Sequence, residues 1–292
     1  MSFTFPVRVV TAFIALATVQ PDPAPLFGQN HPVLIAESGF SKAAGKSGLS
    51  AALAFALHPD GILLWPGAPV VQGAARVGSF LAAQHIADSL RFTLQALGAQ
   101  LSRDSTLGVT WGVAAAAPRT GATAPRLGRY VAAWRRDGER WTLAALLLQG
   151  LTPSARTIIP QGTPIELPPM TAAGDAAAFI AADSDFAKLA ADSGAAIAFE
   201  RYADADAVMG GGLQVRGPSA IGQAVSDPAI WRWHPVAGGA ARSGDLGWTV
   251  GESVVTPTGG DPGPGKYLTV WKRLPDGRVR FVTDGGNARP AK

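Results

Sequence analysis

Two similar stretches occur in this chain, first Gly128-Arg-Tyr-Val-Ala-Ala-Trp-Arg-Arg136 and later Gly265-Lys-Tyr-Leu-Thr-Val-Trp-Lys-Arg273. A second matched pair lies upstream of each copy, as Arg103-Asp-Ser-Thr-Leu-Gly-Val-Thr-Trp-Gly112 and Arg242-Ser-Gly-Asp-Leu-Gly-Trp-Thr-Val-Gly251. Both pairs occur in the same order, and their aromatic and β-branched residues favour strands. The sequence therefore predicts an internal repeat, which has to be recognised before a fold is assigned.

An Asp-Gly dipeptide follows each copy, at Asp137-Gly138 and at Asp276-Gly277. Between alternating strands this dipeptide predicts a β-hairpin with a type I′ turn, because such turns require positive φ. A last strand follows each turn. Each copy is therefore expected to end in a run of antiparallel strands.

The beginning of each copy has the spacing of an amphipathic helix. Apolar residues recur at i, i+3, i+7 and i+10, as Val33, Ala36, Phe40 and Ala43 and again as Phe179, Ala182, Phe186 and Leu189. Such a stripe is one buried face of a helix. A Ser-Gly pair ends each helix, at Ser47-Gly48 and at Ser193-Gly194, and we expect the serine to cap a second short helix.

Helices followed by strands in both copies predict the α+β class. We expect two repeated domains, each with about three N-terminal helices packed on one face of a curved antiparallel sheet. The first domain is predicted at residues 30–151 and the second at 170–288, with Thr171 as the N-cap of the second domain's first helix. A Pro-rich linker lies between them.

The amino-acid composition excludes several kinds of functional site. The chain has 292 residues, 47% of them hydrophobic, which is enough for a large core. It contains no cysteine, which excludes disulfides, thiol catalysis and cysteine-bound zinc. The four histidines form no H-x-x-x-H pair. We therefore predict no metal and no cofactor.

The net charge of +4 does not indicate a nucleic-acid partner. Binding of nucleic acid would require a basic stripe with exposed aromatic residues. Here Arg135, Arg136 and Arg140 flank the turn at Asp137-Gly138 and are interpreted as the solvated end of a hairpin.

The N-terminus has the three-part pattern of a secretory signal. Arg8 precedes an apolar run that ends in the cleavage-like Ala15-Leu16-Ala17, and a Pro-rich stretch follows. The run is too short to span a bilayer, and no other span is predicted. Residues 1–25 are thus predicted to be a signal peptide and linker, and the protein to be periplasmic or secreted. A buried N-terminal strand is the alternative, and a chain that retains it would be cytoplasmic.

The helix–helix–strand–helix–sheet order resembles the cone-shaped fold of nuclear transport factor 2 and ketosteroid isomerase. The resemblance is closest to the SnoaL-like branch of that superfamily, through Ser243-Gly-Asp-Leu-Gly-Trp-Thr-Val-Gly251, Gly265–Arg273, Asp276-Gly277 and Phe281-Val-Thr-Asp-Gly285. It covers the second copy well, whereas the last strand of the first copy, Trp141–Gly150, lacks the aspartate and looks degenerate.

The resemblance implies a pocket between the helices and the concave face of each sheet. Members of the superfamily often dimerise through the open face of the sheet, so two copies in one chain suggest an internal pseudo-dimer. The fold by itself does not specify an activity, because it hosts isomerases, dehydratases, cyclases and plain binding modules.

Asp284 is the candidate catalytic residue. It follows the apolar strand Val279–Thr283, and a carboxyl group in apolar surroundings has a raised pKa and can act as an acid or a base near neutrality. The alternative is that Asp284 hydrogen-bonds its own backbone in an Asx-turn.

Six further residues of the second copy are candidates for ligand contacts because they are aromatic or titratable and lie on predicted strands: Trp231, Trp233, His234, Trp248, Glu252 and Tyr267. Each has a structural alternative. The tryptophans and the tyrosine are also typical of a core, His234 of a surface position before a proline, and Glu252 of a solvated strand end.

Two functional hypotheses remain open at this point. The first is an exported, non-catalytic protein that binds a small apolar molecule. The second is an isomerase or lyase that uses Asp284 as a general acid/base on a small apolar substrate. The sequence favours the binding role, because no acid/base pair can be assigned from it.

Overall fold

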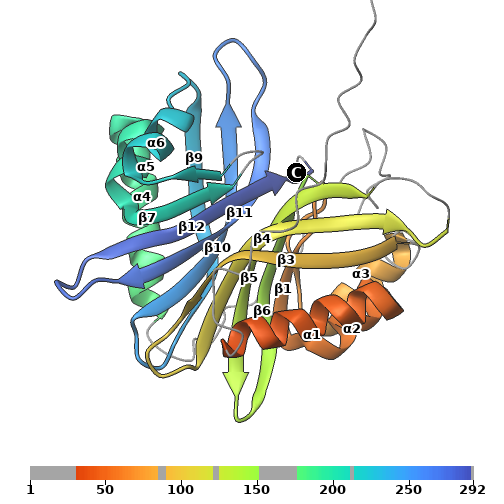
Figure 1. Ribbon diagram of the computed structural model, residues 1–292. Helices are drawn as coiled ribbons and strands as arrows, with labels where there is room; N and C mark the ends of the chain where they lie inside the picture. Colours follow the sequence, from red (N-terminus) through yellow and green to blue (C-terminus); the bar gives the residue numbers. More distant parts are fainter. Residues whose placement is uncertain (1–30, 85–89, 121–124, 151–175, 211–213, 291–292) are drawn as a thin grey trace, which may run out of the picture.

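The computed structural model describes residues 31–84, 90–120, 125–150, 176–210 and 214–290. These residues form two six-stranded sheets, each preceded by helices (Figure 1). The predicted fold, two α+β domains with helices packed on a curved sheet, is confirmed. We call the part up to Gly150 the first half and the part from Ala176 the second half.

The first half contains three helices and six strands. In chain order these are α1 (Pro32–Ser47), α2 (Leu49–Ala56), β1 (Leu57–Leu64), β2 (Val71–Gln72), α3 (Ala74–Gln84), β3 (Leu90–Leu101), β4 (Leu107–Pro118), β5 (Arg126–Asp137) and β6 (Arg140–Gln149). The strand order is β2-β1-β6-β5-β4-β3. All neighbours are antiparallel except β1 and β6, which run parallel.

The second half repeats this plan element by element. It contains α4 (Ala176–Ser193), α5 (Ala195–Tyr202), β7 (Ala203–Gly210), β8 (Gln214–Arg216), α6 (Pro218–Ala224), β9 (Ile230–Ala240), β10 (Leu246–Thr256), β11 (Gly263–Arg273) and β12 (Val279–Ala288). Its strand order is β8-β7-β12-β11-β10-β9, again with one parallel pair, β7 and β12. The duplication seen in the sequence is therefore also a duplication of topology.

The hairpin turns occur where they were predicted, but they are not type I′. Asp137 and Arg140 pair across a two-residue loop in which Gly138 alone has positive φ, as in a type II′ turn. The second turn is longer, because Arg273 pairs with Val279, and again only the glycine, Gly277, has positive φ. Type I′ would require positive φ at both central residues, and neither turn places an aspartate in that strained conformation.

The junctions between the first two helices of each half depend on glycine rather than serine. Gly48 and Gly194 separate the helices with φ of 97° and 92°, a region that other residues rarely adopt. Neither α2 nor α5 has a side-chain cap at its N-terminus, so the predicted serine caps are wrong. The predicted cap Thr171, the linker and the signal segment lie outside the described residues.

The first helix of each half packs closely on its sheet. Val33 of α1 and Phe179 of α4 are completely buried and lie against Gly108 of β4 and Gly247 of β10. A Cβ atom at Gly247 would lie 2.3 Å from the ring of Phe179, so glycine is required for this approach. The predicted apolar stripes are thus the faces that the helices bury.

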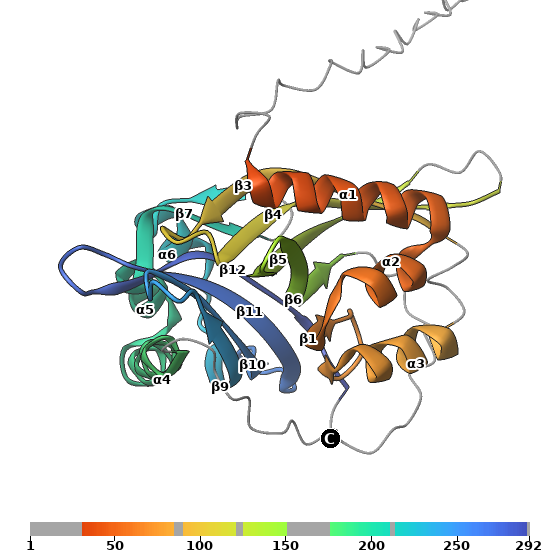
Figure 2. The ribbon, with the colours of Figure 1, turned by 90° about the horizontal axis from the view of Figure 1, so that it is seen from below.

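Apolar side chains of both sheets meet in one buried cluster. The helices cover the outer faces and the two sheets face each other between them (Figure 2). Members of the cluster come from β1, β4, β5 and β6 of the first half and from β9, β10, β11 and β12 of the second, and include Ile62, Val131, Leu147, Trp248, Val250, Leu268 and Val270. We call this cluster the seam.

Polar groups at one end of the seam connect a loop of each half. Asp104 accepts a hydrogen bond from the backbone N–H of Ser243 at 2.8 Å, and Asp245 accepts one from the N–H of Arg103 at 3.0 Å. Burial alone would raise the pKa of Asp104, but hydrogen bonds from Ser102, Thr106 and Ser243 together lower it to about 2. The ionised form of Asp104 therefore favours the folded chain.

We predict that Asp104 contributes to stability above its ordinary pKa and that this contribution is lost in acid. The folded-state pKa lies below the unfolded value, so the contribution is complete above about pH 4 and disappears as the pH falls towards 2. Urea unfolding should show that the wild type loses more stability than Asp104→Asn between pH 5 and pH 2. Parallel losses in both proteins would contradict the role of the carboxylate.

Candidate ligand pocket

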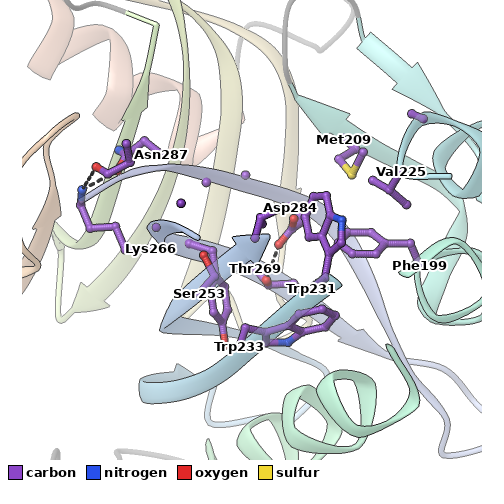
Figure 3. Close-up of a pocket in the computed structure, with 18 of the residues that line it drawn as sticks. Phe199, Met209, Val225, Trp231, Trp233, Ser253, Lys266, Thr269, Asp284 and Asn287 are labelled. Atoms are coloured by element: carbon purple, nitrogen blue, oxygen red, sulfur yellow. Dashed lines mark hydrogen bonds between the residues drawn. The ribbon is translucent and has the colours of Figure 1, made fainter. Parts of the chain in front are cut away.

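A pocket of about 860 Å³ lies in the second half between its helices and the concave face of its sheet. Its lining is mainly apolar, with a few polar groups, which is the usual character of a ligand site. The apolar side chains lie at one end and Lys266 and Asn287 at the other, with Asp284 and Thr269 between them (Figure 3).

The floor of the pocket is made of glycine. Gly265 of β11 and Gly286 of β12 both line it, and neither has a side chain to fill the space above the sheet. In the first half the residue that corresponds to Gly286 is Leu148, because Leu148 pairs with Tyr130 as Gly286 pairs with Tyr267. The absence of this side chain is one reason why the second half has room for a ligand.

The wall at the apolar end is aromatic. Trp231 and Trp233 are two residues apart on β9, so strand alternation places both on the concave face. Their rings pack edge-to-face against two helical residues: Trp233 lies 4.7 Å from Phe186 and Trp231 lies 5.7 Å from Phe199, measured between ring centroids. These contacts fix the orientation of the wall.

Asp284 is the carboxyl group of the pocket. It lies within β12 rather than in an Asx-turn, because the strand continues past it to Ala288. Its Oδ1 accepts a hydrogen bond from Thr269 Oγ1 at 2.5 Å. Burial raises the pKa of Asp284 to about 7; the hydrogen bond from Thr269 opposes this rise, and the charge of Asp183 adds to it.

A bulge in β12 places Asp284 on the concave face. Trp271 pairs with Phe281 and Val270 pairs with Thr283, so Val282 is an extra residue in the ladder. Phe281 and Asp284 consequently face the same side although they are three residues apart. Simple alternation would have placed them on opposite faces.

Asp183 is a buried carboxyl group that the sequence analysis did not identify. It lies on α4, where its Oδ2 accepts a hydrogen bond from Tyr267 at 2.9 Å and its Oδ1 accepts one from Trp233 Nε1 at 3.0 Å. Burial raises the pKa of Asp183 to about 6, against the opposing hydrogen bonds from Thr249, Tyr267 and Trp233. Asp183 thus orients two side chains that line the pocket.

The first half contains the same network. Glu37 of α1 accepts a hydrogen bond from Tyr130 at 2.6 Å, and Trp134 donates to Thr110 just as Trp271 donates to Thr249. A signal was present in the sequence: Glu37 and Asp183 interrupt the apolar stripe at the same position of both helices. The duplication indicates that this network is a structural feature of each half.

Buried side chains fill the corresponding space in the first half. Asp284 and Thr269 are replaced by Leu146 and Ala132, which pair in the same register and are completely buried. Phe92 and Leu94 stand in the places of Trp231 and Trp233 and belong to the core. The degenerate character of the first copy therefore corresponds to a packed interior.

The structure brings together four of the seven predicted site residues. Asp284, Trp231, Trp233 and Tyr267 line the pocket. The other three lie elsewhere. Trp248 is buried in the seam, Glu252 forms an ion pair with Arg289 at 3.2 Å, and His234 is exposed. Alternation along β9 and β10 explains this, because these three lie on the opposite face of the sheet.

Neither a metal centre nor a membrane span is found among the residues that the structure describes. No group of three or more histidine, aspartate or glutamate side chains there could hold a metal ion. Within the same residues, no helix is long and apolar enough to cross a membrane.

No family model and no curated protein sequence matches this chain. Among solved structures, an NTF2-like protein with a cystatin-like fold from Novosphingobium aromaticivorans is 20% identical and covers 38% of this chain and 80% of its own, with a TM-score of 0.32. The match covers less than half of this chain.

Two further matches are proteins of unknown function, the first of them described as NTF2-like. One, from Pseudomonas putida, is 16% identical and covers 40% of this chain and 87% of its own, with a TM-score of 0.33. The other, from Mycobacterium tuberculosis, is 15% identical and covers 40% and 67%, with a TM-score of 0.32. The fold rests on the strand order and helix placement described above, and these matches add nothing about a ligand or a reaction.

We predict that the carboxyl group of Asp284 titrates near pH 7. Carbon-13 NMR of the side chain should show this midpoint, and Thr269→Val should move it higher because the hydrogen bond to the ionised form is lost. The folded protein then keeps a proton that the unfolded chain releases at about pH 4, so Asp284 costs stability as the pH rises from 4 towards 7. Asp284→Asn should remove this loss; a midpoint near 4 would contradict the prediction.

Proposed function

We propose that the second half binds a small, mainly apolar molecule in the pocket beside Asp284. The single observation that carries the proposal is a pocket of about 860 Å³ in the second half, lined at positions whose counterparts in the first half carry buried core side chains. In the second half, Gly286 and Asp284 occupy the positions that Leu148 and Leu146 occupy in the first half, and this difference opens the pocket. The buried network around Asp183 and Tyr267 is kept.

The polar groups support a ligand that also makes directional contacts. Asp284 can accept a hydrogen bond when ionised and donate one when protonated. The indole N–H of Trp231 is buried and has no hydrogen-bond acceptor among the described residues, so the pocket wall holds a further donor. An apolar molecule with one or two polar atoms would satisfy both groups.

We predict that Gly286→Leu closes the pocket without unfolding the chain. The leucine would project from the floor as Leu148 does in the first half. Its Cβ would lie 3.1 Å from the backbone oxygen of Lys266, so β11 has to shift by a few tenths of an ångström to accept it. Titration with 1-anilinonaphthalene-8-sulfonate, followed by its own fluorescence, should show affinity reduced by about tenfold or more, which is roughly 1.4 kcal/mol.

Gly39→Leu is the matched control, because a Cβ at Gly39 meets nothing within 4 Å on the exposed side of α1. It should bind the dye like the wild type. Equal binding by wild type and Gly286→Leu would place the dye elsewhere and remove the support for the pocket.

Acid/base catalysis by Asp284 is the second candidate function. The observation that favours it is a carboxyl group whose pKa of about 7 would let it give or take a proton near neutrality while it faces a pocket. An isomerase or lyase acting on a small apolar substrate would use it in this way. The NMR titration of Asp284 tests this candidate, because an ordinary pKa would leave it without a suitable acid.

We also propose that the two halves form an internal pseudo-dimer, sheet against sheet. The support is the seam, whose apolar residues come from both sheets, together with the loop contacts of Asp104 and Asp245. Burial of each large apolar side chain contributes about 1.5–3 kcal/mol, whereas a hydrogen bond contributes about 1 kcal/mol. The apolar contacts therefore dominate the association.

Small-angle X-ray scattering of the full chain should show a single compact particle. A distance distribution with two separated maxima would contradict the pseudo-dimer. The first maximum would come from distances within each half and the second from distances between the halves. Export to the periplasm or the medium stays a prediction of the N-terminal sequence, and protein sequencing of the mature N-terminus after expression with the whole leader would test it.

A further inference from the structure

The last residues of β12 line the pocket and are held by the first half. Strand β7 pairs with β12 only as far as Asp284, so from Gly285 onwards no strand of the described residues lies along one edge of β12. Backbone carbonyl groups on such an edge need other donors. The first half supplies them.

Two direct hydrogen bonds reach this edge. Gln149 Nε2 of the first half donates to the carbonyl oxygen of Gly286 at 2.6 Å, and the N–H of Gly67 donates to the carbonyl oxygen of Ala288 at 2.9 Å. Gly285 allows this approach, because a Cβ there would lie 2.9 Å from the side chain of Leu147 and 3.0 Å from that of Gln149.

Asn287 connects the two halves through its side chain. Its amide nitrogen donates to the carbonyl oxygens of Leu64 at 2.9 Å and Leu148 at 2.7 Å, both in the first half. Its amide oxygen accepts a hydrogen bond from Lys266 Nζ at 2.5 Å (Figure 3). Lys266 is completely buried and also donates to Ala288 at 2.9 Å, so the end of β11 is tied to the same point.

We infer that the first half is part of the ligand-binding apparatus: it fixes the floor of the pocket in the second half, and Gln149 and Asn287 are the positioning residues that hold it. This rests on the proposed binding function, since the floor at Gly286 matters to a ligand only if one binds there. The half that carries core side chains at the corresponding positions thereby supports the pocket of the other.

The inference has a physical cause in the glycine floor. Glycine gives the pocket its volume, but it also leaves the backbone of β12 with more conformational freedom than any other residue would. Hydrogen bonds from the first half restrict that freedom. A ligand then binds to a surface that is already ordered, which avoids the cost of ordering it on binding.

The experiment changes the first half alone. Gln149→Met removes the donor but keeps the length and most of the volume of the side chain, and Gln149 does not line the pocket. Gln95→Met is the matched control, because Gln95 is an exposed residue of β3 in the same half. Both variants are made in the full chain and compared with the wild type in the dye titration and in hydrogen exchange of the peptide that covers residues 282–290.

The expected result is that Gln149→Met binds 1-anilinonaphthalene-8-sulfonate about 3-fold to 30-fold more weakly than the wild type, a range typical of residues that modulate a site without touching the ligand. Hydrogen exchange of the β12 peptide should be faster in the same variant. Gln95→Met should match the wild type in both measurements.

Unchanged dye affinity in Gln149→Met, with or without faster exchange, would overturn the inference, because the contact would not affect the pocket. Weaker binding with unchanged exchange would also overturn it, since the effect would not pass through β12. Failure of the wild type to bind the dye would count against the proposed function instead. Hydrogen exchange would then still decide whether the first half orders β12.

Discussion

Apolar side chains of the two sheets are buried together in the seam, and this burial removes one face of each sheet from water. Each sheet has one face covered by its own helices, and the other face would expose residues such as Leu268 and Val270 if the partner sheet were absent. The six residues Leu143–Leu148 are all buried, which is the pattern of a strand that is covered on both faces. The seam therefore contains buried residues of both halves.

A common framework supports two different interiors. Both halves have a carboxyl group on their first helix that accepts a hydrogen bond from a tyrosine. Glu37 pairs with Tyr130 of β5, and Asp183 pairs with Tyr267 of β11. Leaving such a buried carboxyl group without its partner would be costly, which explains why both halves retain the pair. The two halves differ in their last strand. Leu146 and Leu148 of β6 are buried in the core of the first half, whereas Asp284 and Gly286 of β12 line the pocket of the second.

The sequence predicted the parts of this structure that depend on local pattern. The repeated motifs, the helical stripes at Val33 and Phe179 and the hairpins at Gly138 and Gly277 each follow from residue spacing or from the properties of glycine. Asp183 was missed because a single acidic residue on an apolar helix face has no local partner; its partners, Trp233 and Tyr267, lie on strands far away in the sequence. His234 and Glu252 were grouped with the pocket residues because composition does not tell which face of a strand is concave.

The duplication, the α+β class and the loss of the aspartate from the first copy follow from the order of the residues, because repeats and periodicities are properties of that order. That Asp284 faces the pocket follows only from the folded chain, because it depends on the extra residue Val282 in the pairing of β12 with β11. The same holds for the contacts of Gln149 and Asn287 between the halves. Contacts between residues so far apart in the chain exist only once the two sheets have packed together.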